Sequence, residues 1–457
     1  MADRLRLRRK VFKVIQHPLS LPQKSIFPPG PALREQRCLD FFFRVTVPLL
    51  NQNVTREIWD DIQSNVIAED TSLKDSVVAL SLQHMRFAQS RCDINERDVW
   101  IACSEAYSCA LLSFALLLSR PQFDCKIAAQ VCLLLVIFES LGGNKSALRH
   151  HLRAGLALVS RTSHDTGLRD LYQWIGVNTV IQSHDPSLLT ALRGAFEDQN
   201  LTLSSPSDLI GLCRRTASLV TEVYRFALDS MLDSMLGTAR CRQAQTYTQQ
   251  KLLAPFADAE RHMQEYILDD RNDKSMRLVC QTLYAILLVA RILLACCTTR
   301  YQTTYDKCLP QFSQAIDLCK PYLYQKKETH LFALDPGIIC TLQLIGVLCR
   351  DARKRRAAVD LLMVAPQREG VWYASDSRAL VEAVIEFEER DAEVFDDDGW
   401  CSLVPEERRI HLARFAEPNG WLGDRKVAQL LYKPHVDQGF VEQLVVLQDY
   451  SRGRLTT

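Results

Sequence analysis

The sequence lacks the short motifs by which most nucleotide-dependent enzymes and hydrolases are recognised. No glycine-rich phosphate loop of the form GxGxxG or GxxxxGK[ST] occurs in its 457 residues, and no HExxH, GxSxG or SxxK occurs either. It also has almost no net charge, because 55 lysines and arginines stand against 54 aspartates and glutamates, which leaves +1. No whole-molecule field therefore favours nucleic acid or an anionic membrane, and such binding would need a local patch.

Cysteine is plentiful, but its spacing excludes the common metal and disulfide frameworks. None of the 16 cysteines forms a CxxC pair, and residues 1–91 contain only Cys38. A binuclear zinc cluster, which needs six closely spaced thiolates, is therefore absent. Most cysteines lie in apolar helical runs, as Cys132, Cys280 and Cys340 do, where a free thiol packs as a small hydrophobe. We expect a reducing compartment, cytosol or nucleus, and no cofactor.

The chain also lacks a clear membrane span. Its N-terminus is basic without an uninterrupted apolar stretch, which is not typical of a secretory signal. The apolar run 128–138 is too short to cross a bilayer, and the 20-residue run 278–297 carries Arg291 well inside it. We expect these runs to be buried helices and the protein not to associate with a membrane.

Helical periodicity dominates after a basic, proline-rich segment at 1–33, which we expect to be flexible. The clearest unit is 124–161, where a run that is apolar nearly all round is followed by Gly142 and Gly143 and then by an amphipathic helix. Two such helices form an antiparallel hairpin. The sequence predicts an all-α fold, with one large domain of helical hairpins over 34–457. Further helical runs are expected at 71–91, 95–119, 209–236, 239–268, 274–299 and 336–350, with breaks near 161–170, 182–187, 200–208 and 300–310.

The C-terminal part has a different pattern. Residues 386–398 hold eight acidic residues, which indicates a helix end running into a solvated loop. Two short alternating runs then flank Asn419-Gly420, and an Asn-Gly turn is typical of a β-hairpin. We expect a small hairpin there.

One pattern suggests an enzyme. Asp269, Asp270 and Asp273 form a DDxxD arrangement, and carboxylates one helical turn apart can hold the Mg²⁺ that binds a diphosphate. Class I terpene synthases, which are also all-helical, use this pattern. The second Mg²⁺ motif of those enzymes is not found, and the alternative is an acidic turn whose aspartate caps the next helix.

Two basic clusters are candidate nuclear-import signals. The first is N-terminal, and the second begins a short helix that Asp351 should cap and Pro366 should end. Ala357, Ala358, Leu361, Leu362 and Ala365 are expected to form the buried face of that helix. Because cations at a helix N-terminus oppose its dipole, we expect the acidic segment 386–398 to contact the second cluster. The candidate import residues are Arg4, Arg6, Arg8, Arg9, Lys10, Arg353, Lys354, Arg355 and Arg356.

Four stretches together resemble the regulatory domain of fungal-specific transcription factors, the helical region that follows a zinc binuclear cluster. Residues 38–52 resemble the opening helix of that family, 75–87 its second helix and 126–159 its central hairpin. The most specific stretch is 334–374, because a match of this length and residue order is hard to produce by composition alone. The resemblance covers roughly residues 35–450.

The resemblance implies a nuclear transcriptional regulator, often of a biosynthetic or catabolic gene cluster, with no catalytic residues. The chain departs from the family in having no zinc cluster, which puts direct DNA contact in doubt. It could act through a partner, lack an upstream exon or have diverged to another role. The implied partners are the transcription machinery or another DNA-binding regulator, and a homodimer is left open. The alternatives are the Mg²⁺-dependent enzyme of terpene synthase type and a general helical scaffold.

Overall fold

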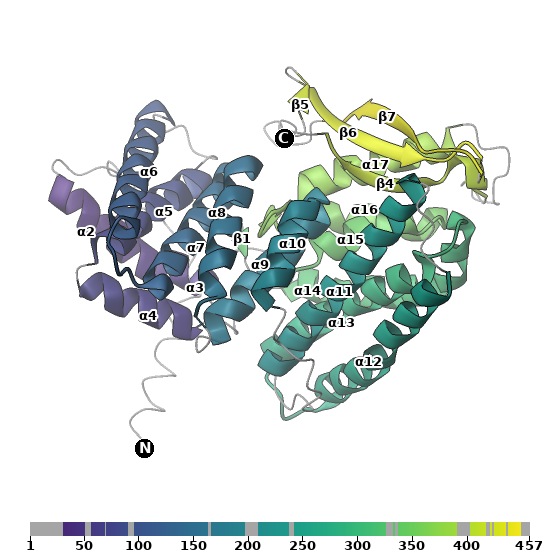
Figure 1. The fold of residues 1–457 in the computed structure, drawn as a ribbon, viewed down its shortest axis with the longest axis horizontal. Helices are drawn as coiled ribbons and strands as arrows, with labels where there is room; N and C mark the ends of the chain where they lie inside the picture. The colour runs from purple at the N-terminus through teal and green to yellow at the C-terminus, as the bar shows by residue number, and fades with distance from the viewer. Residues whose placement is uncertain are drawn as a thin grey trace.

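A computed structural model describes most of the chain from residue 31 onward. The described ranges are 31–50, 56–68, 70–89, 96–162, 166–196, 209–236, 242–325, 332–333, 337–390, 403–416, 421–422, 425–435 and 437–448. Helices dominate these ranges and the strands are few and short, so the predicted all-α fold with a few C-terminal strands is confirmed (Figure 1).

The first group of helices occupies one end of the molecule (Figure 1). Its two central helices, α5 and α7, pack on each other, and α6 and α8 cover them. The group consists of α2 (Pro31–Phe41), the π-helix η1 (Phe42–Thr46), α3 (Val47–Leu50), α4 (Arg56–Ile67), α5 (Thr71–Gln89), α6 (Glu96–Leu118), α7 (Cys125–Gly142) and α8 (Lys145–Val159).

The α7–α8 unit is the predicted helical hairpin. Asp124 caps α7 by accepting hydrogen bonds from the amides of Lys126 and Ile127, and every residue from 128 to 141 is buried. The helix ends at Gly143, whose φ of 79° lies in the left-handed region that favours glycine. The predicted glycine stop and the fully buried first helix are therefore confirmed.

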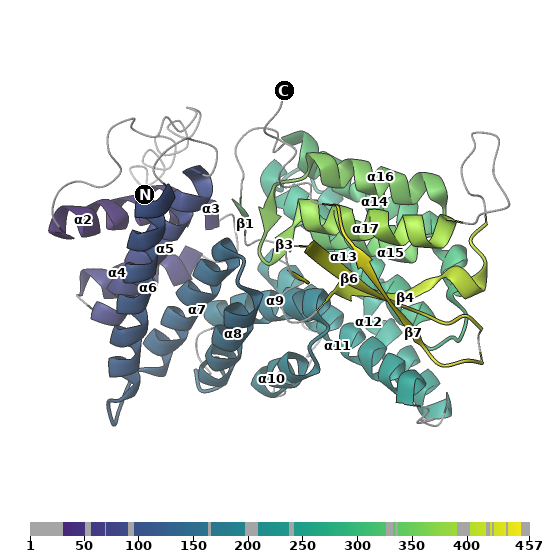
Figure 2. The same cartoon turned by 90° about the horizontal axis from the view of Figure 1, so that it is seen from above.

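The second group of helices fills the other end, and α9 and α10 lie between the two groups (Figures 1 and 2). Within it α13 packs against α11, α12 and α14, while α15, α16 and α17 pack on one another. The helices between the groups are α9 (Thr166–Ser183) and α10 (Pro186–Phe196). The second group consists of α11 (Leu209–Leu236), α12 (Arg242–Leu268), α13 (Lys274–Cys296), α14 (Leu309–Gln325), α15 (Ile339–Leu348), α16 (Ala352–Val364) and α17 (Ala374–Glu389), with the 3₁₀ turns η2 (Gln302–Cys308) and η3 (Glu406–Arg408).

Two small sheets complete the fold. A three-stranded sheet joins β1 (Phe332–Ala333), β2 (Arg368–Glu369) and β3 (Trp372–Tyr373) between the two helical groups. The other sheet contains β4 (Ile410–Phe415), β5 (Trp421–Leu422), β6 (Arg425–Tyr432) and β7 (Val441–Val446), and it lies beside α17 (Figure 2). The predicted C-terminal strands are confirmed in β4 and β6, which pair antiparallel. Their expected Asn-Gly turn falls outside the described residues.

The helical runs expected from periodicity agree with α5, α6, α7, α8, α11, α12, α13 and α15 to within a few residues at each end. The breaks expected at 161–170, 182–187 and 300–310 also separate helices. Four helices were not predicted: α4, α9, α10 and α14. The flexible segment expected at 1–33 lies mostly outside the described residues, as does the expected break at 200–208.

One continuous hydrophobic core extends from Phe42 to Leu447 and connects both helical groups. Three helical stretches are long and apolar enough to cross a membrane by length and composition alone: Asp98–Leu118, Cys125–Gly142 and Lys274–Cys296. The second and third are 78% buried inside the protein, whereas the first is 33% buried and exposes Leu112 and Leu116. By length and composition, the expectation that no stretch could span a membrane is therefore wrong for all three helices, although α7 and α13 are largely buried as expected. The absence of membrane association stays a prediction.

Candidate functional site

The hairpin formed by β2 and β3 is hydrogen-bonded to α7 of the first helical group and to α9. Gly370, with a φ of 53°, makes its turn. Ser140 of α7 donates to the carbonyl of Gly370 over 2.8 Å, and Gln182 of α9 donates to the carbonyl of Val371 over 2.6 Å. The indole N–H of Trp372 donates to Asn178 of α9 over 3.0 Å. Residues about 190–230 positions apart are therefore tied together at one place.

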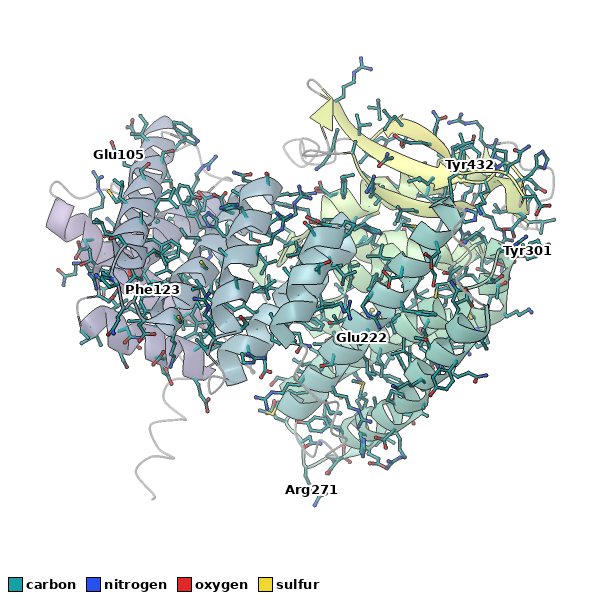
Figure 3. All side chains as sticks on the ribbon, viewed as in Figure 1. Glu105, Phe123, Glu222, Arg271, Tyr301 and Tyr432 are labelled. Atoms are coloured by element: carbon teal, nitrogen blue, oxygen red, sulfur yellow. The ribbon has the colours of Figure 1, made fainter. Side chains whose placement is uncertain are left out.

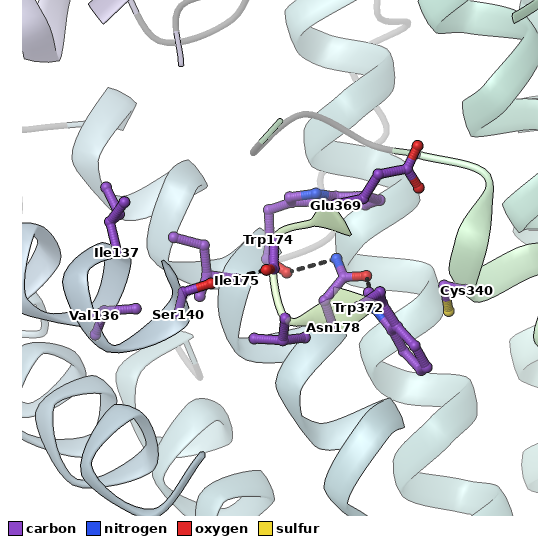
Figure 4. A pocket seen from close by; sticks show the side chains of 12 residues that line it. Val136, Ile137, Ser140, Trp174, Ile175, Asn178, Cys340, Glu369 and Trp372 are labelled. Atoms are coloured by element: carbon purple, nitrogen blue, oxygen red, sulfur yellow. Dashed lines mark hydrogen bonds between the residues drawn. The ribbon is translucent and has the colours of Figure 1, made fainter. Parts of the chain in front are cut away.

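A small cavity lies beneath this hairpin (Figure 4). Its walls come from α7, α9, the start of α15 and the hairpin itself. They include Val136, Ile137, Ser140, Trp174, Ile175, Asn178, Gly337, Cys340, Glu369, Gly370, Val371 and Trp372. The cavity has a volume of about 20 Å³. By the same measure one water molecule needs about 10–15 Å³, so the cavity can hold water but not an organic effector.

Glu369 organises one wall of the cavity. It is 4% exposed, and its carboxylate accepts a hydrogen bond from the amide of Ile339 over 2.8 Å, which fixes the first turn of α15. A Cβ at position 337 would lie 2.0 Å from the same carboxylate, so the close approach requires Gly337. Burial, and to a lesser extent Glu369, raise the pKa of the Cys340 thiol, so this cysteine is kept protonated and unreactive.

The predicted basic cluster at 353–356 begins α16 as expected. Asp351 caps the helix by accepting from the amide of Lys354 over 2.9 Å, and the helix ends at Val364, before Pro366. The expected contact with the acidic segment is confirmed: Arg355 lies 2.8 Å from Glu388, and Arg356 lies 2.5 Å from Glu389.

The basic side chains of this cluster differ in accessibility. The side chain of Arg355 has an exposed fraction of zero, and its guanidinium also donates to the carbonyl of Gly346. Arg353 is exposed, whereas Lys354 and Arg356 are only partly so. An import receptor that reads a run of basic side chains could not reach Arg355 in this fold.

The apolar face predicted for α16 is confirmed in part: Ala358, Leu362 and Ala365 are buried, whereas Ala357 and Leu361 are partly exposed. The other candidates, Arg4, Arg6, Arg8, Arg9 and Lys10, lie outside the described residues.

The DDxxD residues lie on the turn between α12 and α13, not along one helix. Asp269 pairs with Arg271 over 2.8 Å, and Asp270 pairs with Arg277 over 2.8 Å. Hydrogen bonds from the Arg271 side chain and backbone lower the pKa of Asp269 to about 2. Figure 3 labels Arg271 at the edge of the molecule, where this turn lies.

Asp273 accepts from the amide of Ser275 and caps α13, as the alternative reading of the motif expects. The three carboxylates therefore point to different partners. Over the described ranges no group of three or more histidine, cysteine, aspartate or glutamate side chains is arranged to hold a metal ion.

The sequence did not indicate the β2–β3 hairpin or its contacts with α9. Asn178 and Gln182 lie in a helix that was not predicted, and Trp372 belongs to no recognised sequence motif. The one available signal was that 334–374 is the most specific stretch of the resemblance, and the hairpin lies within it. No protein family, curated protein or solved structure matches this chain.

Proposed function

We propose that the chain is a transcriptional regulator: a helical regulatory and protein-interaction domain of the fungal zinc-cluster type, without a zinc cluster of its own. It would act in the nucleus through the transcription machinery or another DNA-binding regulator. A biosynthetic or catabolic gene cluster is the target class that the resemblance implies.

One observation carries this proposal. Two stretches of the resemblance, the central hairpin 126–159 and the most specific stretch 334–374, are far apart in the sequence but supply most of the cavity wall beneath the β2–β3 hairpin. Ser140 from the first stretch donates directly to Gly370 of the second. A shared contact between the two stretches supports a common, evolved unit over a chance likeness of separate helices.

The described part of the chain also supports a role in binding over one in catalysis. The carboxylates of the enzyme-like motif pair with arginines of the same chain or cap a helix. The enzyme of terpene synthase type therefore has no observation in its favour beyond the spacing of Asp269, Asp270 and Asp273.

A tethering assay tests the proposal directly. The full chain is fused to an unrelated DNA-binding domain, and transcription of a reporter carrying the matching site is measured in a fungal host. We expect reporter transcript to change several-fold relative to the DNA-binding domain alone. Trp372→Phe, which removes the link to Asn178, should reduce the effect, whereas Trp100→Phe on the exposed surface of α6 should not. Reporter transcript equal to that of the DNA-binding domain alone would count against the proposal.

Localisation provides the second test. A fluorescent fusion should concentrate in the nucleus, and deletion of residues 1–12 should weaken this. Changing Arg353 and Lys354 to glutamine should have a smaller effect, because this run includes the buried Arg355. A cytosolic wild-type fusion would contradict a nuclear role. The purified chain alone should give no specific band in a DNA mobility-shift assay.

A further inference from the structure

Three cationic side chains from three separate elements gather near the β2–β3 hairpin. Lys145 begins α8, Arg368 belongs to β2 and Lys426 belongs to β6. Asp376, in the first turn of α17, is the carboxylate that faces them within the described ranges. We refer to these four residues as the cationic cluster.

Arg368 is the most deeply buried member of the cluster. It is 2% exposed, and its guanidinium lies 3.8 Å from the centre of the Tyr373 ring. The guanidinium donates to the carbonyl of Gly370 over 3.0 Å and to the hydroxyl of Tyr373. Over the described ranges, no carboxylate is in ion-pair contact with Arg368. Burial lowers its pKa to about 9, and Asp376 opposes this only in part.

Lys145 and Lys426 share one aromatic ring. Their ammonium groups lie 4.1 Å and 5.7 Å from the centre of Phe415. Lys426 also pairs with Asp376, whose side chain is 13% exposed. Lys145 has no carboxylate within ion-pair distance among the described residues. Burial lowers the pKa of Lys145 to about 8, Asp376 raises it, and Lys426, Arg368 and Arg149 lower it further.

The charges of the cluster do not balance. Among the described residues, three cations face one carboxylate, and that carboxylate already pairs with Lys426. Because charge removed from water is unfavourable unless it is paired, a bound anion would stabilise this arrangement. The N-terminal end of α8, a 15-residue helix that starts at Lys145, adds a favourable dipole for negative charge.

We infer that the cationic cluster binds a small oxyanion ligand, a phosphate ester or an organic acid, whose negative group lies between Lys145 and Arg368. The hairpin that carries Arg368 is also hydrogen-bonded to α7 of the first group through Ser140 and to α9 through Gln182 and Asn178. Occupancy of this site would therefore affect how firmly the groups are joined. Arg368 and the ring of Tyr373 would position the ligand from one side, and Lys145 would face it from the other.

Inorganic phosphate and citrate are suitable probes, because they separate phosphate from carboxylate recognition. Each is titrated into the purified full chain at constant ionic strength, and the thermal midpoint of unfolding is measured. A ligand at a hundred times its Kd should raise the midpoint by about 3 °C for a chain of this length. If only phosphate raises the midpoint, the ligand is a phosphate ester, and if only citrate raises it, the ligand is an organic acid.

Three variants make the test specific. Lys145→Gln removes one cation and should weaken the apparent affinity about tenfold. Asp376→Asn removes the competing carboxylate and should strengthen the apparent affinity for the anion by a similar factor. Lys251→Gln, at an exposed lysine of α12, is the matched control and should leave it unchanged. General stabilisation by these salts affects all variants alike and cancels in the comparison.

The inference is overturned if neither probe shifts the wild-type midpoint, or if Lys145→Gln and Asp376→Asn respond as wild type does. Circular dichroism checks that each variant is folded, and Asp376→Asn still decides the question if Lys145→Gln does not fold. These measurements involve no transcription readout, so the result stands whether or not the proposed function holds.

Discussion

The guanidinium of Arg355 and the carboxylate of Glu388 form an ion pair over 2.8 Å, and both side chains have an exposed fraction of zero. Glu388 also pairs with Arg350 over 3.1 Å and accepts from the amide of Ile410 over 2.7 Å. The pair thus connects α16, the end of α17 and the first strand of the C-terminal sheet. Removal of one partner would leave a buried charge uncompensated, which is much more costly than the loss of a surface pair.

We expect Glu388→Gln to lower the free energy of unfolding by about 3–5 kcal/mol, because Arg350 and Arg355 would both lose their carboxylate. Denaturant titration monitored by circular dichroism measures the change. Glu386→Gln is the matched control, since Glu386 is 72% exposed and pairs with Arg390 over 3.7 Å. It should cost about 0.5 kcal/mol or less. Equal losses in the two variants would contradict a structural role for the buried pair.

The same carboxylate should make stability depend on pH. Burial raises the pKa of Glu388, but Arg350, Arg355 and the amide of Ile410 outweigh it, so the net direction is downward. A group whose pKa is lower in the folded state stabilises the protein above its unfolded pKa, near 4.3, and the contribution is lost as pH falls. The difference in unfolding free energy between wild type and Glu388→Gln should therefore shrink below about pH 4. A difference that stays constant between pH 7 and pH 3 would argue against this assignment.

The hydrogen bond between Trp372 and Asn178 should contribute separately to the free energy of unfolding. Trp372→Phe keeps an aromatic ring in a site that is 2% exposed but leaves the Asn178 oxygen without the indole donor. We expect a loss of about 1–3 kcal/mol in unfolding free energy, measured by denaturant titration. Trp100→Phe, at a side chain that is 54% exposed, should change it by less than about 0.5 kcal/mol. A Trp372→Phe variant as stable as wild type would show that this hydrogen bond does not hold the hairpin to α9.

Local features of the fold followed from the sequence because their causes are local. The α7 run, its Gly143 stop and the Asp351 cap each depend on residues within one or two turns. Even the contact between α16 and the acidic segment was predictable, because a basic run at a helix start needs nearby negative charge. That Arg355 in particular would be buried was not predictable, since it depends on how α16 and α17 pack.

The hairpin site and the cationic cluster were not predictable for a related reason. Ser140, Asn178 and Gln182 contact the hairpin from two helices, and their spacing in the sequence shows only helical periodicity. Lys145, Arg368 and Lys426 come from three elements separated by dozens to hundreds of residues. Periodicity defines the face of each helix but not which distant element meets that face.

The glycine stop of α7 can be tested by a pair of substitutions with opposite expected signs. Gly143→Ala should destabilise the protein by about 1–2 kcal/mol, because φ is 79° and the new Cβ would lie 3.2 Å from the Tyr373 hydroxyl. Gly194→Ala lies inside α10 with nothing within 4 Å of the new Cβ. It should stabilise by about 0.5–1 kcal/mol, because alanine is the better helix former. Thermal and denaturant unfolding measure both, and the same sign for the two variants would contradict the assignment of Gly143 as a left-handed cap.

The protonation of Lys145 should control the affinity of the inferred anion site. Burial lowers the pKa of this ammonium group to about 8, and the charged groups that act on it are Asp376 of α17, Lys426 of β6, Arg368 of β2 and Arg149 of α8. Below pH 8 the ammonium is charged and attracts an oxyanion, whereas above it the neutral amine does not. The Arg368 guanidinium keeps its charge over this range, so the affinity should fall in part, but not wholly, between pH 7 and 8.5. Phosphate titrations of wild type should show this decline, because phosphate itself becomes only more negative over the same range. Lys145→Gln should bind more weakly at pH 7 and show little further change up to pH 8.5. An affinity in wild type that is constant from pH 7 to 8.5 would show that Lys145 does not contact the anion.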